Sequence, residues 1–241
     1  MESSLEMTAV APEAPLPGLA DLFFSPLATL ASLRDRSRVL LPLLIAASYA
    51  TVVSYYAISR IGLRRLIEAS IRATASVDPE TLVESAMTHK TEILQMQAAG
   101  AFFGTIVTVL GLALLYWLLV TVIGGEATFG RVASVVAHVT FFTTVIKQTM
   151  IALAVTITRN PAGFNLKHPL GTNLAFYIHS SSPALAKLMT SFDLLALAGL
   201  ALLTWGLSRV SDRVSLRAAA AIVLIPWTLY VAVTVAYPAL G

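Results

Sequence analysis

The 241-residue sequence contains no cysteine. Structural disulfides, thiolate metal sites and cysteine nucleophiles are therefore excluded. Charge is also scarce, since Asp, Glu, Lys and Arg make up 12% of the residues, about half of the usual share in soluble domains. Apolar residues reach 57%, more than one core of a chain this short can enclose. The composition excludes an ordinary cytosolic enzyme and predicts that much of the apolar surface faces membrane lipid.

The usual signatures of enzyme sites are missing as well. The sequence has no phosphate-binding loop, dinucleotide fingerprint, Gly-x-Ser-x-Gly elbow or His-Glu-x-x-His helix. Its four histidines do not have metal-ligand spacing on one helix. We therefore expect no enzyme activity, no cofactor and no metal site.

Basic residues are few and lie close to apolar segments. The 16 Lys and Arg residues form no continuous basic face of the kind that nucleic acid requires, and their placement suits phospholipid headgroups better. Membrane lipid is thus the expected partner, and nucleic acid is not. The first basic residue is Arg34, so the basic region of a cleaved signal peptide is missing and the first apolar segment is expected to be a retained anchor.

Runs without charge predict the membrane architecture. A helix of about 20 apolar residues crosses the hydrocarbon layer. The predicted spans cover residues 39–59, 98–125, 132–158, 183–208 and 216–236. Polar, Pro-rich residues 1–21 are expected to be a disordered tail, and residues 22–241 form one membrane domain. The predicted fold class is an all-α integral membrane protein, with five transmembrane helices plus interfacial amphipathic helices before the first span and in residues 60–96.

Three stretches of this pattern are similar to one known family. They are residues 23–26 (Phe-Phe-Ser-Pro), residues 124–129 (Gly-Gly-Glu-Ala-Thr-Phe) and the fourth span from Ser191 to Ser208. Their order and spacing over residues 22–237 resemble the Yip-domain family of Ypt/Rab-interacting membrane proteins, in the form that bacteria carry. The third span departs from many members, because residues 138–142 contain no proline. The resemblance implies a bacterial inner-membrane protein.

The orientation of the chain in the membrane is predicted from charge and resemblance together. The Lys/Arg tally of the loops does not decide it, because the two sides carry similar numbers. The Arg clusters before the first span and after the fourth favour a cytoplasmic N-terminus. The resemblance implies the same orientation.

Ionisable residues inside the spans are the sharpest indication of a site. Lys147 in the third span and Asp193 in the fourth are predicted at similar depth, where an unpaired charge costs at least about 2.5–3.5 kcal/mol. Two interpretations stay open: a structural ion pair, and a polar cavity or lipid-headgroup pathway. Gln148 and His138 complete the predicted intramembrane polar site.

Three further groups of residues are candidates for binding or packing. Lipid-headgroup contacts are predicted for arginines that flank the first span or lie on the amphipathic helix, namely Arg34, Arg36, Arg38, Arg64, Arg65 and Arg72. The link between the second and third spans is predicted to bind a headgroup or a partner, or to be a solvated turn, through Gly124, Gly125, Glu126 and Arg131. Close helix packing, within the chain or between chains, is predicted at Gly100, Gly104 and Gly111.

The function these features favour is a non-enzymatic membrane organiser or partner-binding scaffold of the Yip class, with a protein partner or a homo-oligomer as a possible assembly. The alternative is a small-solute or lipid transporter or channel that uses the polar site between the third and fourth spans. A polar face is present on the third span at Thr140, Thr143 and Thr144, but the second and fifth spans offer little to continue it.

Overall fold

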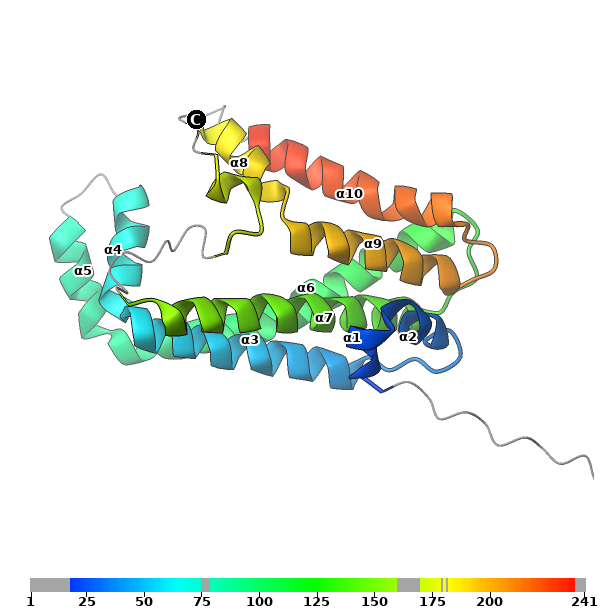
Figure 1. The fold of residues 1–241 in the computed structure, drawn as a ribbon, viewed down its shortest axis with the longest axis horizontal. Coiled ribbons are helices and arrows are strands. Elements are labelled where there is room, and N and C mark those ends of the chain that lie inside the picture. Colours follow the sequence, from blue (N-terminus) through cyan, green and yellow to red (C-terminus); the bar gives the residue numbers. More distant parts are fainter. Residues whose placement is uncertain (1–17, 75–78, 160–169, 179, 181, 237–241) are drawn as a thin grey trace, which may run out of the picture.

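The computed structural model describes residues 18–74, 79–159, 170–178, 180 and 182–236. The predicted tail, apart from residues 18–21, lies outside the described residues, as does the side chain of Arg72. Every named element of this part is a helix, and Figure 1 shows their arrangement. The elements are α1 (Asp21–Phe24), α2 (Pro26–Ser32), α3 (Leu40–Ile61), α4 (Leu63–Thr74), α5 (Pro79–Thr88), α6 (Lys90–Val122), α7 (Phe129–Ile157), η2 (Leu174–Phe176), α8 (Pro183–Ser191), α9 (Leu194–Arg209) and α10 (Leu216–Ala236).

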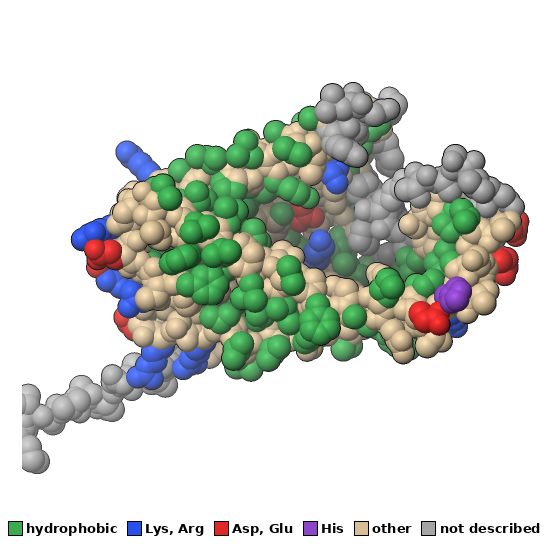
Figure 2. Space-filling view, turned by 180° about the vertical axis from the view of Figure 1, so that it is seen from behind, with side chains coloured by type: hydrophobic (Ala, Val, Ile, Leu, Met, Phe, Trp, Pro, Cys, Tyr) green, Lys and Arg blue, Asp and Glu red, His purple; other side chains and the backbone are tan. Residues whose placement is uncertain are grey.

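Four helices of the described part are long and apolar enough to cross a membrane: α3, α6, α7 and α10. They correspond to the first, second, third and fifth predicted spans. On the face in Figure 2, apolar side chains cover the middle of the bundle and charged side chains gather toward its two ends. The all-helical class and the membrane character are therefore confirmed.

The fourth predicted span is not one helix. The chain breaks at Phe192 and Asp193, which separates α8 from α9. The Asp193 carboxylate accepts hydrogen bonds from the N–H groups of Leu195 and Ala196, so it starts a new helix instead of lying inside one. The 16 residues of α9 rise only about 24 Å, which leaves it shorter than the four spanning helices.

The helices form two packed groups. α3, α6 and α7 pack on one another, α9 and α10 form a hairpin, and α9 lies against α7 (Figure 1). The N-terminal half of α7 is the centre of the core, because every residue from Val132 to Val139 is buried. The short helices α1 and α2 are docked on this core. The centroid of the Phe23 ring lies 5.8 and 5.2 Å from the ring centroids of Phe141 and Phe142 in α7.

Close helix packing is found at glycines other than the predicted ones. A Cβ atom added at Gly206 of α9 would lie 2.5 Å from Val135 Cγ1 of α7, and one added at Gly199 would lie 3.2 Å from Thr143 Cγ2. The three predicted packing residues Gly100, Gly104 and Gly111 are exposed on α6, with nothing within 4 Å of an added Cβ. Within the chain, the close approach is thus between α7 and α9. Packing of the α6 glycines between chains stays a prediction.

Candidate functional site

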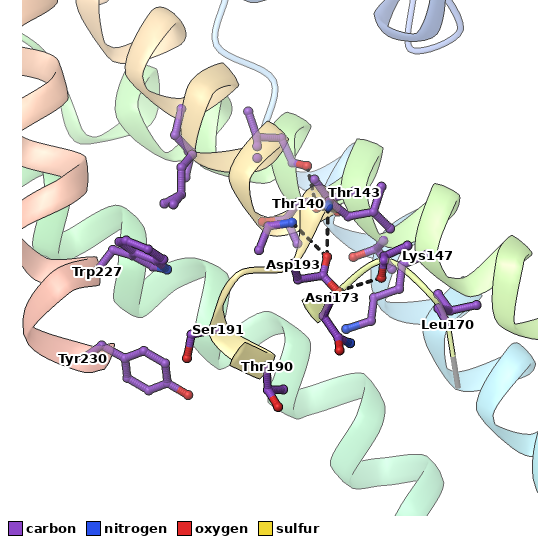
Figure 3. Close-up of a pocket in the computed structure, with 18 of the residues that line it drawn as sticks. Thr140, Thr143, Lys147, Leu170, Asn173, Thr190, Ser191, Asp193, Trp227 and Tyr230 are labelled. Carbon is purple, nitrogen blue, oxygen red and sulfur yellow. Dashed lines mark hydrogen bonds between the residues drawn. The ribbon is translucent and has the colours of Figure 1, made fainter. Parts of the chain in front are cut away.

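A cavity of about 580 Å³ lies between α7, α8, α9, α10 and the segment that precedes η2. Figure 2 shows it as a hollow in which basic and acidic side chains are visible behind the apolar surface. Its polar walls come from α7, the break between α8 and α9, and residues 172–173; Trp227 and Tyr230 face it from α10 (Figure 3). The polar and aromatic lining residues are Thr140, Thr143, Thr144, Lys147, Thr172, Asn173, Lys187, Thr190, Ser191, Asp193, Trp227 and Tyr230.

The cavity is amphipathic. Two ammonium groups, from Lys147 and Lys187, and many hydroxyl groups line it. Apolar side chains of α7 and α9, including Val139, Leu200 and Leu203, complete the lining. Because Lys147 is ten residues from the end of α7, it lies about 15 Å along the helix from that end. The cavity therefore combines positive charge with apolar surface in a membrane-spanning part of the bundle.

The Asp193 carboxylate is used by the protein itself. Its Oδ1 caps α9 at 2.9 Å from Leu195 N and 3.2 Å from Ala196 N, and its Oδ2 accepts a hydrogen bond from Thr172 Oγ1 at 2.7 Å. The Leu194 N–H donates to the Thr172 carbonyl at 2.8 Å, which fastens the same segment to the break. A carboxylate at a helix N-terminus is also favoured by the helix dipole. Asp193 thus holds the fold of the cavity wall.

The structure brings Lys147 and Asp193 to one cavity but not into an ion pair. Among the described residues, no salt bridge within 4.0 Å includes Lys147. Of the two open interpretations, the geometry favours the polar cavity. Gln148 and His138, the other members of the predicted site, are not among its lining residues, and His138 lines a separate, smaller cavity.

Sequence reasoning missed Lys187, Thr172 and Asn173 as members of the site. Residue 187 lies on the short helix α8, which had been predicted as part of a continuous span. The signal that could have found the break is Asp193 itself, because an N-cap residue type directly before an apolar run marks a helix start. The approach of residues 172–173 to Asp193 has no signal in the sequence, since it is a contact between segments 21 residues apart.

The Gly-Gly link has a structural role in its own right. Gly124 has a φ of 81°, and an added Cβ at Gly125 would lie 2.8 Å from the Val120 carbonyl oxygen. Glu126 pairs with Arg213 of the α9–α10 loop at 2.7 Å, and its N–H donates to Ser211 Oγ. The backbone N–H of Arg131 is bonded to Thr128 Oγ1, the N-cap of α7.

The predicted headgroup arginines differ in their surroundings. Arg34 makes two hydrogen bonds to the Asp212 carboxylate, at 2.6 and 2.5 Å, and this contact lowers the pKa of Asp212 and raises that of Arg34. Arg64 lies between Glu68 at 3.1 Å and Glu84 at 2.9 Å. These two are held by carboxylates. Arg36 and Arg38 line the smaller cavity, and Arg65 is half-buried on α4.

The cap geometry leads to a prediction about Asp193 and Lys147. Asp193→Leu should destabilise the protein by about 1–2 kcal/mol, because it leaves the first N–H groups of α9 unpaired. Lys147→Met should have little effect on stability, and the double variant should be no more stable than Asp193→Leu alone. Thermal unfolding in detergent measures all three. Recovery of stability in the double variant would instead indicate the ion pair that the spacing suggested, and Asp193→Asn, which keeps the Oδ1 acceptor, is the control.

These features define a class: a polytopic helical membrane protein with an amphipathic cavity beside a broken helix. The described residues contain no cluster of three or more metal-ligand side chains. The chain belongs to the Yip1 domain family, whose model matches residues 20–237. This is a family of non-catalytic membrane proteins that interact with membranes and with proteins. No curated protein and no solved structure matches the chain.

Proposed function

We propose that this protein is a non-enzymatic membrane organiser that holds an individual anionic phospholipid in the large cavity. The observation that carries the proposal is the amphipathic lining, with Lys147 and Lys187 beside apolar side chains of α7 and α9. An ionisable residue within a membrane span is by default part of a functional site. The two ammonium groups are suited to a phosphate, and the apolar surface is suited to an acyl chain.

The proposal includes a topology. α8 and α9 together make a fifth crossing, the N-terminus is cytoplasmic, and the membrane is the bacterial inner membrane. Five arginines at the end that carries α1 and α2 support this orientation. Four of them lie in short connections, and Arg209 is the last residue of α9; the four are Arg34, Arg36, Arg38 and Arg213. Assembly with a protein partner or a second copy, through the exposed face of α6, belongs to the same proposal.

A transporter is the second candidate, and the broken helix favours it. Discontinuous helices whose half-helix N-termini face a site at membrane depth are common in secondary transporters. Here the N-terminus of α9 is already occupied by Asp193. The contact of Gly206 with Val135 also brings α7 and α9 close together beyond the cavity, where a pathway would have to continue. A binding cavity closed at this end fits an organiser better.

The experiment is photocrosslinking of the full chain in nanodiscs with a phosphatidylglycerol that carries a photoactivatable acyl chain. We expect crosslinks on α10 near Trp227 and Tyr230. Labelling of the Lys147→Met/Lys187→Met variant should be about tenfold weaker than that of the wild type, because two charge contacts to the phosphate are removed. The control is Lys90→Met, an exposed lysine at the start of α6. Equal labelling in all three proteins would refute the cavity as a lipid site.

Reconstitution in liposomes separates the two candidates. An organiser should leave the rate of transbilayer movement of a labelled lipid at the level of protein-free liposomes. Accelerated movement that disappears in the Lys147→Met/Lys187→Met variant would favour the transporter.

A further inference from the structure

A second cavity, of about 200 Å³, meets α7 at His138, a residue that does not line the first. It is lined by residues 18–19 before α1, by α2, by the connection between α2 and α3, by the start of α3, and by α7. Its volume is below the roughly 300–1,000 Å³ of ordinary small-molecule pockets, so it has room for a headgroup but not for a whole lipid. Its polar lining residues are Thr29, Ser32, Arg36, Arg38 and His138, and Leu41, which is 59% exposed, lies at its edge.

His138 leaves one ring nitrogen for a ligand. The side chain is 3% exposed, and its Nδ1 lies 2.8 Å from the Ser134 carbonyl oxygen. Because a carbonyl only accepts, Nδ1 carries the hydrogen, and the neutral ring presents Nε2 as an acceptor. No described residue makes a hydrogen bond with Nε2. One turn away, Ser134 Oγ is fully buried and makes no hydrogen bond among the described residues.

The other polar groups of this cavity complete a chemical pattern. Arg36 and Arg38 supply guanidinium donors and positive charge. The hydroxyls of Thr29 and Ser32 donate to backbone carbonyls within the α2 region, at 3.1 and 2.7 Å, so toward the cavity they offer lone pairs. A matching ligand therefore has anionic oxygens for the arginines and hydroxyl groups for His138 Nε2 and the α2 hydroxyls. A choline headgroup has no hydroxyl to donate.

We infer that this cavity binds the phosphate-polyol headgroup of an anionic phospholipid, of which phosphatidylglycerol is the simplest example. The phosphate lies against Arg36 and Arg38, a headgroup hydroxyl donates to His138 Nε2, and the acyl chains leave past Leu41. The site is independent of the larger cavity, because no residue lines both. It unites an arginine cluster and a histidine that the sequence assigns to different sites.

The test uses the full chain in phosphatidylcholine nanodiscs that contain either phosphatidylglycerol or phosphatidylmethanol, which is anionic but has no hydroxyl. Native mass spectrometry counts the retained lipids. The wild type should prefer phosphatidylglycerol. Arg38→Gln should lower retention of both anionic lipids about tenfold through the lost charge contact, whereas His138→Phe should abolish only the preference between them. Arg217→Gln, at the same end of the bundle but outside the cavity, is the control.

Three results would overturn the inference: equal retention of the two anionic lipids by the wild type, no loss in Arg38→Gln, or the same loss in Arg217→Gln. Competition with glycerol 3-phosphate identifies the source of the headgroup. Displacement of the lipid by the free compound at low concentration would mean that the site takes soluble phosphates instead of membrane lipid. If His138→Phe does not fold, His138→Gln tests the same nitrogen, and Arg38→Gln, an exposed position, carries the charge test by itself.

Discussion

Replacing Gly206 with alanine is expected to separate α9 from α7 and to destabilise the protein by about 3 kcal/mol. The new Cβ would lie 2.5 Å from Val135 Cγ1, and Val135 is fully buried in the centre of the core. The new methyl group and the Val135 side chain both lie in a densely packed core. The helices must therefore shift and lose packing over their whole contact. Thermal unfolding in detergent, with the yield of folded protein, measures the effect.

Two further variants make this prediction specific. Removing the two Cγ atoms of Val135 leaves its Cβ at 3.6 Å from the added atom, an ordinary contact, so Gly206→Ala/Val135→Ala should be more stable than the sum of the single changes implies. Gly104→Leu on the exposed face of α6 should leave the melting temperature of the monomer unchanged. Strict additivity in the first pair would mean that the two residues do not meet. A shift of Gly104→Leu to another oligomeric state would show that α6 packs between chains.

Gly125→Ala should be the second most damaging change and should lower the free energy of unfolding by about 2–3 kcal/mol. The added Cβ would lie 2.7 Å from Val120 Cγ1, 2.8 Å from the Val120 carbonyl oxygen and 2.9 Å from Val214 Cγ2. The oxygen belongs to the last turns of α6 and cannot rotate away, so the link itself must move. That movement would also disturb the bond from Glu126 N to Ser211 Oγ.

The neighbouring glycine supplies the control for this change. An added Cβ at Gly124 meets nothing within 4 Å, but φ is 81°. Gly124→Ala should therefore lower the free energy of unfolding by only about 1–2 kcal/mol, through backbone strain. Gly124→Asn should lower it less, because asparagine tolerates this conformation. Melting temperatures of the three variants give the comparison. If Gly125→Ala were no worse than Gly124→Ala, the close approach at Val120 would not control the stability of the link.

Much of the helical architecture could be predicted from local pattern. The last span was predicted at residues 216–236 and α10 is Leu216–Ala236, because a long charge-free run has few alternatives in lipid. The start of α6 was less well predicted: the helix begins at Lys90, eight residues before the predicted span. Apolar composition marks where a helix enters lipid, but polar residues with good helix propensity continue it into the interface.

The candidate sites were harder to predict than the helices. Lys147 and Asp193 were recognised because charge in a membrane span is costly, and both do line the large cavity. Their surroundings depend on distant segments. Thr172 bonds to Asp193 from 21 residues away, and the connection between α2 and α3 places Arg36 and Arg38 around the cavity that His138 also lines. Contacts between distant segments leave no periodic pattern within a single segment, so the sequence does not predict them.

The sequence by itself determined that this chain is helical, lies in a membrane and reverses direction at residues 124–125, because hydropathy and turn chemistry are local properties of the chain. Only the tertiary structure decided that α9 packs on α7 through Gly199 and Gly206, while the similar glycines of α6 face outward. It also decided that Asp193 caps a helix and is not the counter-ion of Lys147. The physical reason is that glycines and charged residues with the same local sequence pattern differ only in the atoms that surround them. Those neighbours are set by the shape and the distances of the assembled helices.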